Sequence, residues 1–441
     1  MTGAVPPLWR FPFSCERGSF MSELFENTEL RPRAVLVAVD TGAFDAEVSL
    51  EELEELAATN DIETVATVVQ KRDELDRATA LGAGKLAELA EFVKNYEANL
   101  VIFDHELSAT QLRNVEKECG VEILDRTMLI LEIFAARANS HEGRLQVELA
   151  RNKYMLPRLS GLGVELSRLG GGGGGAGAGA RRGKGETKLE LDRRHIRRRI
   201  KSLEEQLESL ESRRELTRRR RRKDGVTSVA IVGYTNVGKS TLLNTLTDAG
   251  VLVQDKLFAT LDPTARSLEL PDGRGILLID TVGLVRRLPH HLVQAFKSTL
   301  EEAVQADLLL NVCDISAPDA QDQVEVTRAL LEELGARQVP VLEVLNKADR
   351  LQGAPPHVGK NAVLLSAKDG TGLEELLGKI TAMLPPSQSR LTLLVPYDEG
   401  GLLAEIRREG KILSEDYDEG GTLVDALVDH KLLHKVHAFI Q

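Results

Sequence analysis

Short apolar stretches alternate with amphipathic ones through the first third of the chain. Runs of strand length occupy residues 34–40, 63–69, 100–103 and 121–124, and helix-like stretches occupy 49–59, 85–95, 108–118 and 126–138. Ser49 and Ser108 are suited to cap two of these helices at their N-termini. This alternation predicts a small parallel sheet with helices on its faces. We therefore expect an N-terminal α/β domain over residues 34–140, preceded by a disordered extension over 1–33.

The next segment has a helical pattern without strand signals. A helix is predicted at 145–158, and a run of glycine and alanine follows at 170–180. In the long helix after it, apolar residues recur at intervals of four and three: Ile196, Ile200, Leu203, Leu207 and Leu210. This spacing is typical of packed helices. It predicts an antiparallel helical hairpin with a Gly-rich loop over residues 141–225.

A second α/β pattern fills residues 226–386, with strands predicted at 229–232, 276–279 and 341–345. A small α+β C-terminal domain is predicted for 387–441, with a strand at 391–395 and a helix at 401–409. The fold class is therefore α/β overall, with a mostly parallel sheet expected in the second α/β domain.

Charge is distributed unevenly along the chain. The net charge is -12, yet residues 181–223 carry 18 Lys or Arg against 8 Asp or Glu, and the remainder has a net charge of -22. A basic segment inside an acidic protein predicts a local contact with a polyanion. A solvated helix face is the alternative interpretation. Arg181, Arg182 and Lys184, directly after the glycine run, are the candidate RNA contacts.

Composition also indicates the cellular compartment in which the protein is expected. No run of about 18 apolar residues occurs, so membrane insertion is not expected. Cys15, Cys119 and Cys313 are far apart in sequence, which argues against a disulfide framework or a zinc site and fits a reducing compartment. We expect a cytoplasmic protein, with Met1 and Met21 both candidate translation starts.

A glycine-rich loop follows the strand at 229–232 and leads into a helix. It reads Gly233-Tyr234-Thr235-Asn236-Val237-Gly238-Lys239-Ser240 and continues with Thr241. In such a P-loop, backbone N–H groups and the helix N-terminus bind phosphates, the lysine reaches the β- and γ-phosphates, and the serine hydroxyl binds Mg²⁺. By contrast, Gly82-Ala83-Gly84-Lys85 lacks the full spacing and is expected to be a loop before a helix.

Three further motifs follow in the order that a GTPase requires. They are Asp280-Thr281-Val282-Gly283, Asn346-Lys347-Ala348-Asp349 and Ser366-Ala367-Lys368. Asp280 at a strand tip is expected to hold Mg²⁺, and the Gly283 N–H to meet the γ-phosphate. The Asp349 carboxylate can accept from both the ring N–H and the amine of guanine, a pair that adenine lacks. A backbone N–H at Ala367 is expected to bind the guanine oxygen.

The first switch is expected at Phe258-Ala259-Thr260. Thr260 is the preferred residue to close on Mg²⁺ and the γ-phosphate, and Thr264 is the competing choice. Leu284 stands where several GTPases have a water-orienting glutamine, so intrinsic hydrolysis should be slow. Asn236 is a candidate for K⁺ binding or for bracing the loop. Lys239, Thr260 and Gly283 are the expected catalytic residues, and Ser240, Thr260 and Asp280 the expected Mg²⁺ ligands.

The ordered motifs resemble the Obg-HflX branch of translational GTPases. Segments outside the GTPase domain are similar to the HflX family over roughly residues 34–441, namely ELSATQLRN at 106–114, DRT at 125–127, LQVELA at 145–150 and YMLPRL at 154–159. Two departures stand out. Gly183-Lys184-Gly185-Glu186-Thr187 replaces the family's usual Gly-Pro-Gly-Glu-Thr, and Leu284 replaces a commoner phenylalanine.

The resemblance implies a GTPase that binds GTP and GDP and associates with the large ribosomal subunit. We expect a monomer. The hairpin loop would approach rRNA near the peptidyl-transferase centre, and some members of the family split idle or stalled ribosomes. A GTP-gated ribosome assembly or hibernation factor shares all these sequence features. A non-catalytic RNA-binding scaffold is disfavoured by Lys239, Ser240, Asp280 and Asp349.

Overall fold

A computed structural model gives the fold in two compact units. It describes residues 31–159, 179–223, 226–247, 257–258, 264–287, 289, 292, 304–351, 359–385, 388–418, 420–429 and 432–440. The first unit comprises Met1–Leu210 with Gln254–Asp262 and Val282–Ser298, and the second comprises the rest of the chain. Among the described helices, none is both long and apolar enough to cross a membrane.

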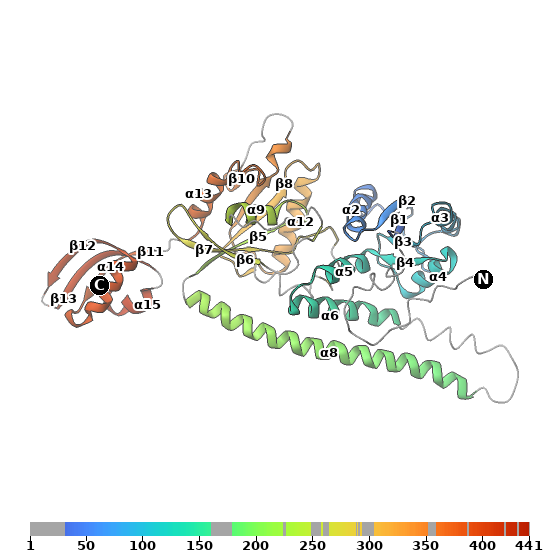
Figure 1. Cartoon of the computed structure of the whole chain (residues 1–441), viewed down its shortest axis with the longest axis horizontal. Coiled ribbons are helices and arrows are strands. Elements are labelled where there is room, and N and C mark those ends of the chain that lie inside the picture. Colours follow the sequence, from blue (N-terminus) through green and yellow to red (C-terminus); the bar gives the residue numbers. More distant parts are fainter. Residues whose placement is uncertain are drawn as a thin grey trace. The chain divides into compact units, whose positions relative to one another are not determined.

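A four-stranded parallel sheet forms the centre of the first unit (Figure 1). Its strands are β1 (Arg33–Asp40), β2 (Glu63–Lys71), β3 (Leu100–Phe103) and β4 (Glu122–Asp125), in the order β2-β1-β3-β4. β1 is central because its residues are apolar on both faces, as a strand covered on both sides requires. The predicted N-terminal parallel sheet is confirmed.

Helices cover both faces of this sheet. Ala34, Leu36 and Ala38 of β1 pack with α2 (Ala46–Thr59) and α5 (Arg126–Arg137). Val35, Val37 and Val39 point the other way and pack with α3 (Ala83–Asn95) and α4 (Ala109–Cys119). The carboxyl ends of β1 and β3 therefore meet at one edge, where open α/β sheets place functional groups.

The helix caps confirm one prediction and correct another. Ser108 caps α4 and forms a capping box with Gln111. α2 begins three residues earlier than expected, because Asp45 rather than Ser49 accepts from the first main-chain N–H groups. Ser49 lies inside the helix, where its hydroxyl donates to Asp104 at 2.8 Å. Gly82 precedes α3 without a side-chain cap, as expected of a loop before a helix.

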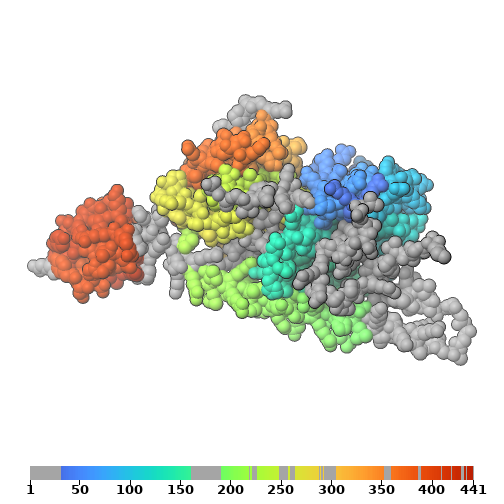
Figure 2. Space-filling model, in the orientation of Figure 1, coloured from blue at the N-terminus to red at the C-terminus, as the bar shows by residue number. Residues whose placement is uncertain are grey.

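The helical region consists of α6 (His141–Arg158) and α8 (Gly179–Lys223), which lie side by side (Figure 1). Leu145 and Leu149 of α6 pack with Leu203 of α8, and Glu148 accepts twice from the Arg199 guanidinium at 2.6 Å. α8 reaches the surface over much of its length (Figure 2).

The start of α8 differs from the prediction. We expected the helix to begin after Lys184, but the backbone is helical from Gly179, so Arg181, Arg182 and Lys184 lie in its first turns. Arginine, lysine and glutamate favour helices enough to offset Gly183 and Gly185. The glycine run up to residue 178 lies outside the described residues.

A buried polar cluster ties α6 to the first sheet. Asp125, fully buried at the end of β4, accepts from the Tyr154 hydroxyl and from Arg158 at 3.2 Å. Arg158 also donates to the Leu107 carbonyl at 2.9 Å, and its guanidinium lies 3.4 Å from the Tyr154 ring centroid. Burial raises the pKa of Asp125, and Arg158 opposes this shift, so the arginine compensates a charge that would otherwise be costly.

A six-stranded sheet forms the centre of the second unit, in the order β10-β9-β8-β5-β7-β6. The strands are β5 (Thr227–Gly233), β6 (Thr264–Glu269), β7 (Gly275–Asp280), β8 (Leu308–Asp314), β9 (Val341–Asn346) and β10 (Ala362–Leu364). All neighbours are parallel except β6, which pairs antiparallel with β7. Within its described residues, the α-helices around this sheet are α9 (Lys239–Thr247), α12 (Ala320–Glu333) and α13 (Leu373–Met383).

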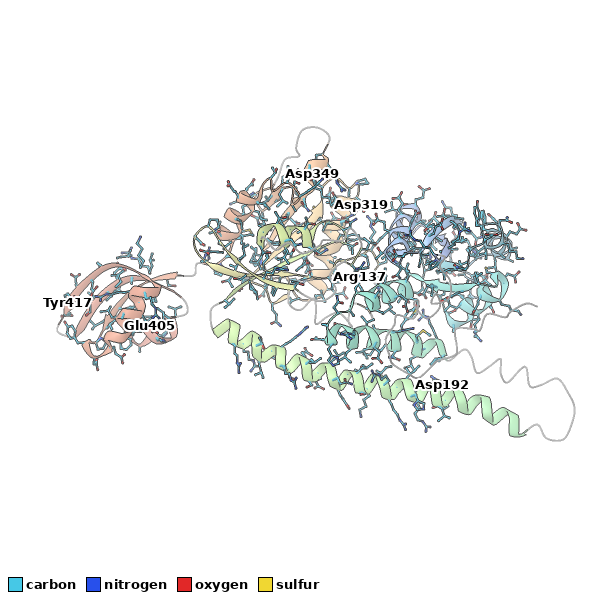
Figure 3. All side chains as sticks on the ribbon, in the orientation of Figure 1. Arg137, Asp192, Asp319, Asp349, Glu405 and Tyr417 are labelled. Atoms are coloured by element: carbon cyan, nitrogen blue, oxygen red, sulfur yellow. The ribbon has the colours of Figure 1, made fainter. Side chains whose placement is uncertain are left out.

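A separate antiparallel sheet ends the chain, with β11 (Gln388–Val395), β13 (Gly421–Asp429) and β12 (Lys411–Asp418) in that order. Leu402 and Ile406 of α14 (Gly400–Glu409) and Val436 of α15 (Leu433–Val436) pack on it. Tyr417 projects from β12 and is 75% exposed (Figure 3). The prediction of a small α+β region is confirmed, although only β11 and α14 were expected individually.

We predict that Leu203→Ala loosens the α6–α8 pair, because Leu203 is fully buried and the loss of a buried leucine costs about 2–5 kcal/mol. Amide hydrogen exchange in α6 should become faster, and the midpoint temperature of thermal unfolding should fall. Leu191→Ala is the matched control on the same helix, since Leu191 is 49% exposed. Equal exchange in the two variants would contradict this account of the hairpin.

Candidate nucleotide site

The phosphate loop lies at the carboxyl end of β5 and leads into α9. Gly233, the last residue of β5, has φ 144°, and a Cβ there would lie 2.1 Å from the Val312 carbonyl oxygen of β8. Only glycine fits this close approach of two main chains. Asn236, at the exposed tip of the loop, has φ 59°, a conformation that asparagine tolerates better than most residues.

The Asn346 amide joins the loop to the motifs at the ends of β9 and β10. Its Nδ2 donates to the Val237 carbonyl at 2.7 Å, and its Oδ1 accepts from the Ala367 N–H at 2.9 Å. Gly238 has φ 93°, and a Cβ there would lie 2.4 Å from Asn346 Nδ2. The second glycine of the motif is therefore needed for the bridge as well as for the turn.

Lys239 is buried at the start of α9 and folds back over the loop. Its Nζ donates to the carbonyls of Gly233 at 3.1 Å and Tyr234 at 2.5 Å. Burial lowers the pKa of Lys239 to about 8, and the nearby Asp280 opposes this shift. A buried ammonium with so little compensation favours an anionic ligand beside it.

Ser240 and Asp280 lie together although they are distant in sequence. The Ser240 hydroxyl donates to Asp280 Oδ2 at 2.7 Å, and Asp280 is 1% exposed at the end of β7. Thr281 is fully buried and donates to the Ile231 carbonyl at 2.7 Å, which fixes the main chain beside Asp280. A hydroxyl and a carboxylate at one point form an oxygen donor set suited to a hard divalent cation.

Ser366 and Asp349 lie together on the side of the site that is predicted to contact the base. The Ser366 hydroxyl donates to Asp349 Oδ1 at 2.8 Å, and this bond lowers the pKa of Asp349. Asp349 lies in a short 3-10 helix, Ala348–Arg350, after β9 (Figure 3). Lys347, with φ 63°, forms an ion pair with Asp314 at 2.7 Å. The carboxylate is thus held ionised and oriented, as an acceptor of two N–H donors must be.

The Ala367 N–H is the group that we expected to bind the guanine oxygen. In the structure it donates to the Asn346 side chain, so its role toward a base stays a prediction. Lys368, the last residue of that motif, is exposed beside it.

Thr245 has a positioning role that the sequence did not predict. Thr245, on α9 beyond the P-loop motif, donates to the Ala367 carbonyl at 2.8 Å. It joins the helix that carries Lys239 to the loop that carries Ser366. No motif marks it, because a threonine on an amphipathic helix has no distinctive pattern.

The switch residues are only partly described. Thr264, the competing magnesium ligand, is the first residue of β6 and pairs with Asp280 of β7, so it is built into the sheet. Ala259 and Thr260 lie outside the described residues. Phe258, Val282 and Gly283 belong to the first compact unit, where Phe258 packs edge-on against Phe134 with ring centroids 4.6 Å apart.

Three family models match the chain in succession. A GTP-binding GTPase N-terminal model matches residues 47–135, and a GTP-binding GTPase middle-region model matches 137–221. A model described as a 50S ribosome-binding GTPase matches 228–347.

Curated relatives extend the match to nearly the whole chain. GTPase HflX of Caldanaerobacter subterraneus subsp. tengcongensis is 50% identical over 423 residues, which are 96% of each protein. GTPase HflX of Escherichia coli is 40% identical over 385 residues, covering 86% of this chain and 89% of the relative. A GTP-binding protein of Sulfolobus solfataricus, solved in complex with GDP, has a TM-score of 0.43 at 25% identity and covers 80% of this chain and 98% of its own. With the ordered motifs assembled as described, the chain belongs to the HflX family of GTPases and is a GTP-hydrolysing enzyme.

Proposed function

We propose that this GTPase associates with the large ribosomal subunit in the cytoplasm, as a monomer, and splits or rescues idle or stalled ribosomes. The observation that carries the proposal is the strongly basic segment of α8 in a chain that is otherwise acidic and carries a nucleotide site. Basic segments bind RNA phosphates, and a GTPase unit can time the release. The 50S ribosome-binding description of the matching family model supports the same partner.

The nucleotide is bound by the loop and the three following motifs. Phosphates lie against the main chain of the P-loop, where Lys239 exchanges its carbonyl partners for phosphate oxygens. The burial of Lys239 supports this role, because a polyanion compensates the charge that burial disfavours. The proposed nucleotide-binding residues are Gly233, Tyr234, Thr235, Asn236, Val237, Gly238, Lys239, Ser240, Thr241, Phe258, Ala259, Thr260, Asp280, Thr281, Val282, Gly283, Asn346, Lys347, Asp349, Ser366, Ala367 and Lys368.

Mg²⁺ fits the donor set of Ser240 and Asp280, with Thr260 as the third protein ligand. When bound, the ion neutralises charge that develops on the phosphates. K⁺ is proposed near the exposed Asn236, whose amide oxygen is a suitable ligand. Lys239, Thr260 and Gly283 are the proposed catalytic residues. The Leu284 side chain is buried at 3% exposure and offers no polar group, so a partner or another group must orient the attacking water.

The alternative is a GTP-gated assembly or hibernation factor. It would use the same nucleotide site and the same basic helix, with Arg181, Arg182 and Lys184 contacting rRNA near the peptidyl-transferase centre. The two functions differ in their product: splitting yields free subunits from intact ribosomes, whereas an assembly factor leaves intact ribosomes unchanged.

Asp349→Asn is expected to change base preference from guanine to xanthine. An amide can donate to the xanthine O2 and accept from its N1–H, whereas it opposes the guanine amine with a second donor. GTP affinity should fall by about a hundredfold and XTP affinity should rise, measured by titration with fluorescent nucleotides. Asp369→Asn, an exposed position in the neighbouring loop, is the matched control. If the variant kept the preference for GTP over XTP, Asp349 would not be a base-binding residue.

Purified large subunits should stimulate GTP turnover by on the order of tenfold or more, because they complete a site that lacks a water-orienting side chain. Lys239→Ala should abolish the stimulated rate and weaken GTP binding about tenfold to a hundredfold. Turnover is measured with and without subunits, and light scattering of intact ribosomes reports splitting in parallel. Stimulation without splitting would favour the assembly or hibernation factor, and a rate indifferent to subunits would refute the ribosomal assignment.

Replacing Arg181, Arg182 and Lys184 by alanine should weaken binding to the subunit while GTP affinity stays normal. The number of counterions released on binding, obtained from the salt dependence of the affinity, should fall by up to about three. The measurement is co-sedimentation with large subunits over a series of salt concentrations. A variant with Arg213, Arg214 and Arg220 replaced removes the same charge elsewhere on α8. Equal weakening in both variants would indicate general attraction rather than a contact at the start of the helix.

A further inference from the structure

The loop after β10, residues 366–371, is closed by its own hydrogen bonds. The Ser366 N–H donates to the Thr371 carbonyl at 3.0 Å, and the Gly370 N–H donates to the Ser366 carbonyl at 2.9 Å. The Ser366 hydroxyl also donates to the Asp349 carboxylate at 2.8 Å. The main chain at Ala367 and Lys368 is therefore held in a tight turn that begins at the partner of Asp349.

Both polar main-chain groups of Ala367 are held by side chains from other elements of the second unit. The Ala367 N–H donates to Asn346 Oδ1 at 2.9 Å, and the Ala367 carbonyl accepts from the Thr245 hydroxyl at 2.8 Å. Asn346 is the last residue of β9, whereas Thr245 lies on α9, the helix that begins at Lys239. Two elements thus fix one alanine that is 2% exposed.

The contact between Thr245 and the loop is not a general property of threonines on this helix. Thr245 and Thr247 both donate to the carbonyl four residues earlier on α9, at 3.0 Å to Thr241 and at 2.7 Å to Leu243. Of the two, Thr245 alone also donates to the Ala367 carbonyl. Because a hydroxyl has one hydrogen, Thr245 shares it between the helix and the loop. Thr247 is therefore a matched position that has the local bond without the contact to the loop.

The held carbonyl also fixes the direction of a neighbouring N–H. A trans peptide is planar, so its carbonyl and its N–H point in opposite directions. The Ala367 carbonyl and the Lys368 N–H belong to the same peptide, so the Thr245 hydroxyl orients both. Within the described part of the chain, the Lys368 N–H has no hydrogen-bond partner. It is a main-chain donor whose direction is set before a ligand binds.

Guanine needs such a donor next to the Asp349 carboxylate. Asp349 is proposed to accept from the ring N1–H and the 2-amine, and the 6-oxo group is bonded to the ring carbon next to N1. A site that donates to the 6-oxo group rejects bases that lack this acceptor, because its own donor would then be left unpaired. The Ala367 N–H is already engaged by Asn346, so the Lys368 N–H is the donor that needs no sharing.

We propose that Thr245 is a positioning residue for guanine recognition: by holding the Ala367 carbonyl, it directs the Lys368 N–H to the 6-oxo group of the base. This inference rests on the nucleotide site proposed above and names the group of the base that the 366–371 loop recognises. One helix would then carry Lys239 and Ser240 for the phosphates at its start and, within about two turns, the residue that positions the base-binding loop.

The test measures the affinity of the full chain for three nucleoside diphosphates, by competition with a fluorescent GDP. GDP has the N1–H, the 2-amine and the 6-oxo group. Inosine diphosphate lacks the 2-amine, and 6-thio-GDP has sulfur, a weaker acceptor, in place of the 6-oxo oxygen. Thr245→Val keeps the shape of the side chain and removes the hydroxyl. Affinities for GDP and inosine diphosphate should fall about threefold to tenfold, as for the loss of one neutral hydrogen bond, while that for 6-thio-GDP changes less than about twofold.

Two further variants control for the helix and for the side chain. Thr247→Val removes only the local bond to the Leu243 carbonyl and should leave all three affinities unchanged. Thr245→Ser keeps the hydroxyl and should bind GDP as the unsubstituted chain does. Thr245 is exposed, so its replacement should not unfold the chain, and an unchanged melting curve verifies this.

The outcomes separate this inference from the nucleotide site on which it rests. If the unsubstituted chain prefers GDP to 6-thio-GDP and Thr245→Val keeps that preference, the role of Thr245 is wrong and the nucleotide site stands. Equal weakening of all three ligands would also overturn the inference, because Thr245 would then support the helix rather than the contact with the base. If the unsubstituted chain binds GDP no better than 6-thio-GDP, the contact of the loop with the 6-oxo group fails, and if it does not bind GDP, the nucleotide site itself is refuted.

Discussion

The side-chain amide of Asn346 is the constraint on which the nucleotide site depends. It donates to the main chain of the phosphate loop and accepts from the main chain of the loop that carries Ser366, and it is 2% exposed. An amide supplies a donor and an acceptor in one rigid plane, which a carboxylate or a lysine cannot do. The loops proposed to bind phosphate and to contact the base are therefore held at a fixed separation, and Gly238 is small because this amide passes beside it.

Most of the candidate site could be predicted because each motif is local in sequence. The motifs follow directly after β5, β7 and β9, so periodicity and spacing were enough to predict their place at strand ends. Ser240 and Asp280, which were both expected to hold Mg²⁺, lie together, whereas the contact of Asp349 with Ser366 was not predicted. What the sequence could not supply were contacts between distant segments with no local pattern, such as Thr245 with Ala367, or Arg287 with Asp104. Those depend on packing, which is set by the whole fold.

The predicted and observed secondary structures also differ where contacts between separate segments decide the outcome. Asp45 took the capping position because its carboxylate reaches two N–H groups, which left Ser49 inside α2 and available to Asp104. β6 was missed because it has only two apolar residues and none of its residues is buried, so it is a strand only by pairing with β7. β12 and β13 likewise stabilise each other by antiparallel pairing, which ends with Asp418 opposite Gly421. Such strands have little signal of their own, because the partner strand provides their stability.

The two thiols in the described part of the chain are both buried. Cys119 belongs to the α3 and α4 core, and burial raises its pKa to about 11; Cys313, buried in β8, has a pKa raised to about 12. Since the thiolate is the reactive form, neither should react readily with maleimides or mild oxidants at neutral pH. A chain with Cys15 replaced would thus accept a fluorophore at a cysteine engineered into the surface of α2. The fluorescence of this label could then be followed during a single round of hydrolysis, while the buried Cys119 and Cys313 stay unlabelled.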